Sequence, residues 1–160
     1  MVASSGFDSQ ACALAHGAVE AAPDGRAVVA VFDSPVATQL LHFAATLGYR
    51  VALADPDLAG VTVDADTDVV VCDHDRPELG AALRDALASP ARWVGVMGSP
   101  RHTAPHVAAL RELGVAEADI ARVHRPIGLN IGSRTPAEIA LATLAGLVAD
   151  RNDRPGGFAF

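Results

Sequence analysis

The residues best suited to bind a ligand lie in two short segments. The first is GVMGSPRH, residues 95–102, in which Gly98, Ser99 and Arg101 follow an apolar run. Backbone amides, a hydroxyl and a guanidinium within one turn suit a phosphate or a similar oxyanion. A simpler interpretation is that Ser99 caps a helix starting here and that Arg101 is solvated. The segment therefore predicts either an anion site or a helix cap.

The second segment is HRPIGLNIGSRTPAEIA, residues 124–140. Gly128 and Gly132 flank a nonhelical stretch that contains Asn130, and Arg134 follows it. Glycines on both sides indicate close approach by a ligand or by another part of the backbone. We expect a ligand-binding loop or, alternatively, a tight connection to the helix that follows.

Asp55 is a weaker candidate, at the end of a predicted strand. It follows the first turn by about 20 residues, where a dinucleotide fold places a ribose-binding carboxylate, although a turn or a cap also explains it. The first turn reads Phe32-Asp33-Ser34-Pro35 and has none of the glycines that cradle a pyrophosphate. This weakens NAD(P) binding, and we expect Asp33 or Ser34 to cap the next helix instead.

The sequence predicts no catalytic group and no metal site. His74 stands alone between two aspartates, and such a loop histidine is usually solvated. Cys12 and Cys72 are far apart and form no C-x-x-C motif, which supports neither a zinc site nor a disulfide framework. All twelve basic residues are Arg, which excludes a lysine Schiff base and a P-loop lysine.

Length and net charge limit the number of domains and the kinds of partner that we expect. A chain of 160 residues fits one domain with a full core. Its net charge of −7, without a basic block, argues against nucleic acid as a partner. No apolar run approaches the roughly 20 residues that span a bilayer, and no secretory signal is visible. We expect a soluble, cytoplasmic protein with no membrane partner.

Short apolar runs alternate with amphipathic segments and predict the elements that position these residues. Strands are expected over residues 27–32, 50–55, 68–73 and 92–97. Helices are expected over residues 36–47, 76–88, 102–113, 116–123 and 136–150. This alternation predicts an α/β fold, a Rossmann-like three-layer sandwich with a mainly parallel sheet. Ligands of such folds bind beyond the carboxyl ends of the strands, where the candidates lie.

Local signals predict helix starts and the domain boundaries. Thr135 and Glu138 predict a capping box with Pro136 in the first turn, and Asp75 is expected to cap the helix from residue 76. Residues 1–26 form an Ala-rich segment that could contain a helix. A single domain is expected over residues 27–150, followed by a flexible tail over residues 151–160.

Residues 92–148 resemble the C-terminal domain of the XdhC family, the accessory factors of xanthine dehydrogenase and related molybdenum hydroxylases. The runs WVGVMGSPRH, LRELGV and ARVHRPIGLNIGSRTPAEIALATLAGLVA carry this resemblance, and weaker similarity extends back to residue 28. It implies a Rossmann-like fold, a cytoplasmic location and often a homodimer. It also implies a chaperone that binds the molybdenum cofactor, assists its sulfuration and delivers it to a molybdenum hydroxylase subunit.

The resemblance places Ser99, Arg101, Gly128, Gly132 and Arg134 at the ligand edge. The family usually has a separate N-terminal domain and a first turn similar to F-G-A-G-H, and this chain departs from both. Two alternatives stay open: an NAD(P)-binding oxidoreductase of Rossmann type, and a non-catalytic interaction module derived from that fold. The resemblance favours a cofactor chaperone over a catalyst.

Overall fold

The structure is a computed structural model, and it describes residues 25–158. The predicted N-terminal helix therefore lies outside the described residues. No helix within residues 25–158 combines the length and the apolar character needed to cross a membrane.

Five parallel strands form one sheet in the order β2-β1-β3-β4-β5. The strands are β1 (Ala27–Val31), β2 (Arg50–Ala54), β3 (Thr67–Val71), β4 (Trp93–Val96) and β5 (Val123–His124). β1 and β3 are buried along their whole length, as expected for apolar strands covered on both faces. β2 lies at one edge and is largely exposed. The predicted parallel sheet is confirmed.

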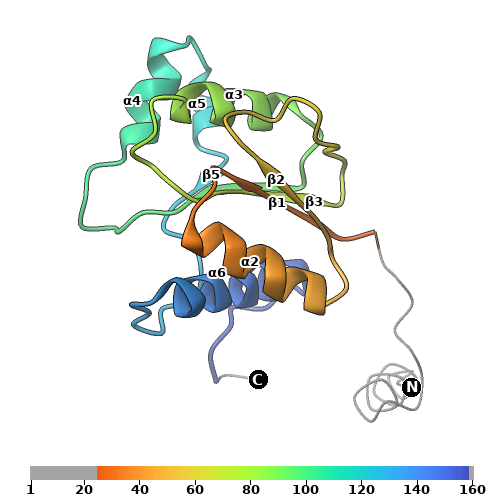
Figure 1. Cartoon of the computed structure of the whole chain (residues 1–160). Coiled ribbons are helices and arrows are strands. Elements are labelled where there is room, and N and C mark those ends of the chain that lie inside the picture. The colour runs from red at the N-terminus through yellow and green to blue at the C-terminus, as the bar shows by residue number, and fades with distance from the viewer. Residues whose placement is uncertain (1–24, 159–160) are drawn as a thin grey trace, which may run out of the picture.

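Helices cover both faces of the sheet and complete the three layers (Figure 1). One face carries α2 (Pro35–Thr46) and α6 (Pro136–Arg151); the other carries α3 (Leu79–Ala88), α4 (Pro105–Glu112) and α5 (Glu117–Ile120). Alternate residues of β1 enter opposite cores: Val28 packs with α2 and α6, and Val29 packs with α3. The Rossmann-like sandwich is confirmed.

Two helix caps occur where local chemistry predicts them. The Thr135 hydroxyl accepts the Glu138 amide at 3.2 Å, and the Glu138 carboxylate accepts the Thr135 amide at 3.1 Å. At α2 the cap is Ser34, whose hydroxyl accepts the Ala37 amide at 3.1 Å. Both helices thus begin at fixed points on the carboxyl edge of the sheet.

Two other helices begin later than predicted. Asp75 does not cap α3, because its amide donates to the Asp73 carboxylate in a tight turn, and the helix starts only at Leu79. Ser99 does not cap α4, which starts at Pro105 after the nonhelical residue Ala104. A residue before proline is disfavoured in the helical conformation, so the chain enters the helix at the proline itself.

Two further differences concern the C-terminal half. The short strand β5 is absent from the prediction, because two residues give no readable periodicity. Arg151 is the last residue of α6 and not the start of a flexible tail. Its guanidinium is held against the sheet by the Asp68 carboxylate at 2.9 Å.

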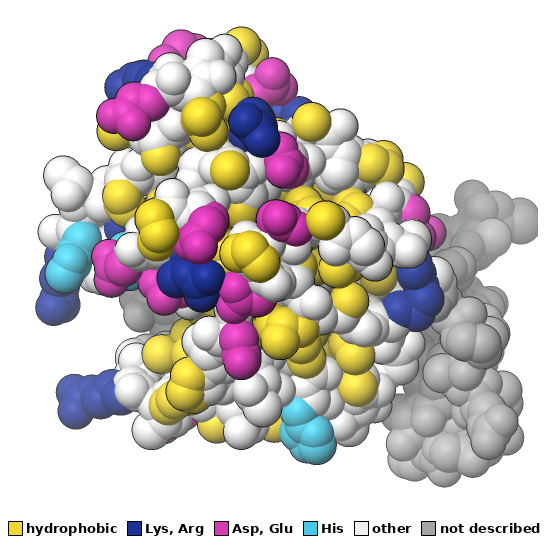
Figure 2. Space-filling model, turned by 45° about the horizontal axis from the view of Figure 1, so that its top comes forward, with side chains coloured by type: hydrophobic (Ala, Val, Ile, Leu, Met, Phe, Trp, Pro, Cys, Tyr) yellow, Lys and Arg dark blue, Asp and Glu magenta, His cyan; other side chains and the backbone are white. Residues whose placement is uncertain are grey.

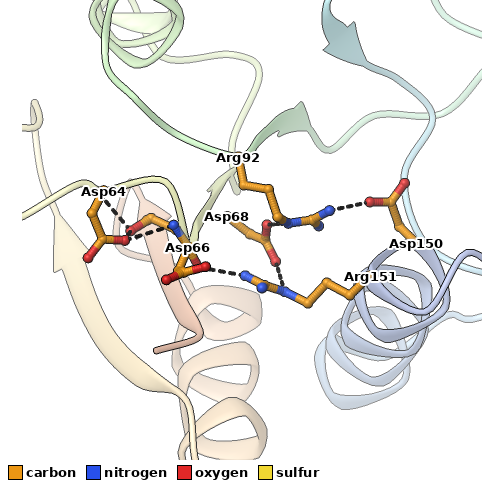
Figure 3. Close-up of polar contacts among 7 residues, drawn as sticks. Asp64, Asp66, Asp68, Arg92, Asp150 and Arg151 are labelled. Atoms are coloured by element: carbon orange, nitrogen blue, oxygen red, sulfur yellow. Dashed lines mark hydrogen bonds and ion pairs between the residues drawn. The ribbon is translucent and has the colours of Figure 1, made fainter. Parts of the chain in front are cut away.

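A buried ion-pair cluster closes the amino edge of the sheet (Figure 3). Asp68 in β3 has a fully buried side chain and accepts hydrogen bonds from Arg92 at 2.7 Å and Arg151 at 2.9 Å. Arg92 also contacts Asp150 at 2.6 Å, and Arg151 donates to the Asp66 carbonyl at 2.6 Å. These contacts connect the end of α6 to the starts of β3 and β4.

Candidate functional site

The carboxyl edge of the sheet divides into two halves of opposite charge. Acidic residues follow β1, β2 and β3: Asp33, Asp55, Asp57, Asp73, Asp75 and Glu78. Arginines follow β4 and β5: Arg101, Arg125 and Arg134. Figure 2 shows acidic side chains gathered near the middle of the face in view, with basic side chains projecting at its left. A negatively charged ligand is therefore favoured over β4 and β5.

The turn after β1 is closed by protein groups. The Asp33 amide donates to the Asp55 carboxylate at 2.8 Å, and Arg76 holds both oxygens of that carboxylate at 2.9 and 3.2 Å. The Arg76 guanidinium lies 4.7 Å from the centre of the Phe32 ring, and Phe32 has a left-handed φ of 73°. The hydrogen bonds from Arg76 and Asp33 lower the pKa of Asp55 below its usual value. A ribose hydroxyl would have to compete with these donors for Asp55.

The loop after β4 presents a free arginine. Ser99 accepts the Arg101 amide on its hydroxyl at 3.2 Å, while the Arg101 side chain is exposed and contacts no carboxylate of the described residues. Arg125 follows β5, the strand next to β4, and donates to the Ser99 carbonyl at 2.9 Å. Arg125 also lies directly on Gly98, where a Cβ atom would stand 2.6 Å from its Nε. Arg125 thus fastens the loop that carries Arg101.

Gly128 has a packing role in the loop before α6. Its φ is 85°, and an added Cβ would lie 3.0 Å from the backbone of Ala142 and Thr143 in α6. The next amide, of Leu129, donates to the Ala142 carbonyl at 3.0 Å. Close approach of two backbones accounts for this glycine, which is one of the two explanations that the sequence leaves open.

Gly132, Asn130 and Arg134 lie farther out on the same loop. Gly132 has a φ of 68°, and its missing Cβ would meet nothing within 4 Å. Asn130 and Arg134 are exposed, and neither side chain makes an ion pair or hydrogen bond with another described residue. These three residues are therefore open to a ligand from solvent.

A groove lies beside them, between the first turns of α2 and α6. Its lining residues are Pro35, Thr38, Gln39, Thr135, Pro136 and Ala137. The two helices pack side by side and both begin at this edge (Figure 1). Helix N-termini present free amides and a partial positive charge, which favours an anionic group nearby.

Arginines without an acidic partner collect at this edge. Seven arginines form ion pairs with described carboxylates: Arg50, Arg76, Arg84, Arg92, Arg111, Arg122 and Arg151. Among the described residues, Arg101, Arg125 and Arg134 form none, although the chain has 19 acidic residues. Arg154, beyond the C-terminal end of α6, is the other exposed arginine in this state. Their cationic groups remain available for a ligand.

Metal binding and thiol chemistry find no support within residues 25–158. No cluster of three or more His, Cys, Asp or Glu side chains is placed to hold a metal ion in this part of the chain. Cys72 is buried at the end of β3, and burial raises the pKa of its thiol to about 12. Its thiol is therefore protonated and unreactive at neutral pH.

Arg125 and His106 are the residues that sequence reasoning does not assign to the site. Arg125 flanks the predicted loop in the sequence, but its contacts are with Ser99 and His102, more than 20 residues earlier. His106 lies in the first turn of α4 and is only 5% exposed. Only the order of β4 and β5 in the sheet brings these two residues together.

Comparisons with known proteins agree with this architecture. The chain is 37% identical over 123 residues to the uncharacterized protein YqeB of Escherichia coli K12, which covers 77% of this chain and 21% of YqeB. It is 28% identical over 110 residues to the molybdenum cofactor insertion chaperone PaoD of the same organism, which covers 68% of this chain and 35% of PaoD. The chain thus spans about a fifth and a third of these relatives.

A solved structure shares the fold. A crystal structure described as a xanthine dehydrogenase from Bacillus halodurans superposes with a TM-score of 0.64 at 18% identity, covering 84% of this chain and 45% of that one. The family model described as the XdhC Rossmann domain matches residues 28–147. This match includes the sheet from the second residue of β1 onward and both loops of the basic half, and the chain therefore belongs to the XdhC family.

Proposed function

We propose that this chain holds the molybdenum cofactor during its insertion into a molybdenum hydroxylase, as an accessory factor and not as a catalyst. Family membership supports an accessory role for such hydroxylases, and PaoD is named as a cofactor insertion chaperone. The observation that carries the proposal is the group of unpaired arginines at the carboxyl edge, in a protein whose net charge is −7.

The basic half of the edge would bind the cofactor. Arg101 and Arg134 are exposed, have no acidic partner among the described residues, and would contact the phosphate of the pterin. The loop around Asn130 and Gly132 would lie along the pterin, where backbone amides are accessible. The acidic half repels the same charge and would orient the cofactor toward β4 and β5. The chemistry at molybdenum is that of the cofactor, which this chain would carry as cargo.

Binding can be measured on the purified chain. Molybdenum by elemental analysis and oxidised pterin by fluorescence should copurify with the protein from a host that makes the cofactor. Arg101→Ala and Arg134→Ala should each lower the cofactor content or affinity about tenfold, because each removes a charge-assisted contact. Their unfolding transitions should stay unchanged, because both side chains are exposed and make no ion pair or hydrogen bond with another described residue.

Arg154→Ala is the matched control. Arg154 is also exposed and without an acidic partner among the described residues, but it follows α6 at the opposite edge. Its replacement should leave cofactor binding unchanged. Equal losses in all three variants would mean that overall charge drives binding, and no binding by the parent chain would contradict the proposal.

The recipient would be a molybdenum hydroxylase subunit. A tagged form of the chain should capture such a subunit in its cofactor-free form, and the Arg101 and Arg134 variants should still do so, since they change the cargo site. The proposed homodimer is tested on the same preparation by light scattering, with a monomer mass as the opposing result.

A further inference from the structure

Arg125 is a partly buried cation with unused hydrogen-bond donors. One short bond reaches the Ser99 carbonyl at 2.9 Å, whereas its contacts with the His102 carbonyl are long, at 3.4 and 3.5 Å. Its Nε atom is buried and has no partner. No described carboxylate lies within ion-pair distance of it. A partly buried cation without a counterion loses part of its hydration, and this favours the binding of an anion that reaches it.

His106, next to Arg125, also has a buried nitrogen atom without a hydrogen-bond partner. His106 is only 5% exposed, and its Nδ1 atom has no hydrogen-bond partner. Burial and the charge of Arg125 lower the pKa of His106, which keeps the imidazole neutral near pH 7. A neutral imidazole can carry its proton on Nδ1 and donate it. His106 Nδ1 and Arg125 Nε are thus two buried nitrogen atoms without a hydrogen-bond partner, on residues that interact electrostatically in the basic half of the edge.

The backbone beside Arg125 has unused donors. The amides of Gly98 and Ser99 make no hydrogen bond to another described residue. Gly98 carries no side chain, and a Cβ there would collide with the guanidinium of Arg125. The missing side chain thus lets the guanidinium pack directly on the backbone of this loop.

We propose that Arg125 and His106, with the amides of Gly98 and Ser99, form a subsite for a tetrahedral oxyanion of the phosphate monoester class. The oxyanion replaces the distant His102 carbonyl as the acceptor for Arg125 and neutralises its charge. The inference deepens the proposed function and rests on it for the biological ligand, the phosphate of the cofactor. Free inorganic phosphate has the same chemistry and serves as the probe.

The first experiment uses the unmodified chain. The Nε–H signal of Arg125 and the ring signals of His106 are followed by NMR while inorganic phosphate is added, with chloride at equal ionic strength as the control. Saturable shifts at both residues are expected with phosphate only. Phosphate should also raise the melting temperature, because a ligand that binds the native state stabilises it.

The second experiment uses variants. Arg125→Gln should weaken phosphate binding at least about tenfold, and His106→Gln less, because the charged contact contributes more than a neutral one. Arg154→Gln is the matched control and should bind as the parent does. If Arg125 only fastens the loop, Arg125→Gln lowers the melting temperature, while phosphate leaves the parent unchanged in both experiments; that result overturns the inference.

Different results would contradict this inference and the proposed function. Phosphate binding at Arg125 without any cofactor binding would support the subsite and contradict the proposed function. Cofactor binding that Arg125→Gln leaves intact, without phosphate shifts at Arg125, would contradict the subsite alone. Cofactor binding that competes with phosphate would support both.

Discussion

The two edges of the sheet treat charge in opposite ways. At the amino edge, Asp68 lies buried between Arg92 and Arg151, and opposite charges are paired (Figure 3). At the carboxyl edge over β4 and β5, Arg101 and Arg134 have no acidic partner among the described residues. The first arrangement joins elements of the fold. The second leaves charge exposed, which contributes little to folding and is available to a ligand.

The amino edge should show the largest effect on stability. Asp68→Asn removes the buried carboxylate that Arg92 and Arg151 share, so that only Arg92 keeps a carboxylate partner, Asp150, and we expect a loss of about 3 kcal/mol in the free energy of unfolding. Asp85→Asn removes the exposed partner of Arg84 and should cost less than about 0.5 kcal/mol. Urea unfolding measures both. Equal costs would mean that the cluster at Asp68 is no more important than a surface pair.

Substitutions at Gly128 and Gly132 should show that one end of the loop is packed against α6 and the other is exposed. Gly128→Ala forces a side chain into the backbone of α6 at a left-handed φ, and we expect a loss of about 2–3 kcal/mol in stability. Gly132→Ala meets only the backbone penalty, because nothing lies within 4 Å, and should cost about 1 kcal/mol. Thermal unfolding compares the two. A larger cost at Gly132 would contradict this division of the loop.

The start of α2 should give a smaller effect. Ser34→Ala removes the side-chain cap of the helix and should cost about 1 kcal/mol. Asp33→Gly should lower the free energy of unfolding by only about 0.3 kcal/mol. The Asp33 amide keeps its bond to Asp55, and Ser34 still caps the helix. Neither change should alter cofactor binding. A larger loss for Asp33→Gly would show that Asp33 also caps the helix.

At Cys72, which is buried at the carboxyl end of β3, we expect an effect on chemical reactivity and not on stability. Because burial raises the pKa of its thiol to about 12, the native protein carries almost no thiolate below pH 9. In a Cys12→Ser background, the reaction of Cys72 with an aromatic disulfide reagent at pH 8 should be at least about 100-fold slower in buffer than in urea. Fast reaction in buffer would mean that the end of β3 opens to solvent.

Local patterns predict most of the elements of this fold. Buried apolar runs identify β1 and β3, and the spacing of Thr135 and Glu138 identifies the start of α6, because caps and strand periodicity depend on adjacent residues. The later start of α4 and the two-residue strand β5 are not predicted. The start of α4 depends on the local restriction of Ala104 by Pro105, whereas β5 depends on pairing with β4, which is distant in the sequence.

The candidate site divides in the same way. The residue types in the two loops predict either an anion site or the alternatives of a helix cap at Ser99 and a tight connection at Gly128 and Gly132. Their partners are invisible in the sequence: Asp55 meets Arg76, and Arg125 reaches Ser99. Whether a polar or charged side chain has a partner depends on which residues the fold places next to it.

The sequence by itself determined the α/β class, the family, the loops that reach the carboxyl edge and the absence of glycines in the first turn. Only the tertiary structure decided which charges are neutralised within the protein. The fold places Asp55 beside Arg76 and leaves the side chains of Arg101, Arg125 and Arg134 without an ion pair to any described carboxylate. Charge pairing acts over a few ångströms in space, whereas sequence patterns report on neighbours along the chain.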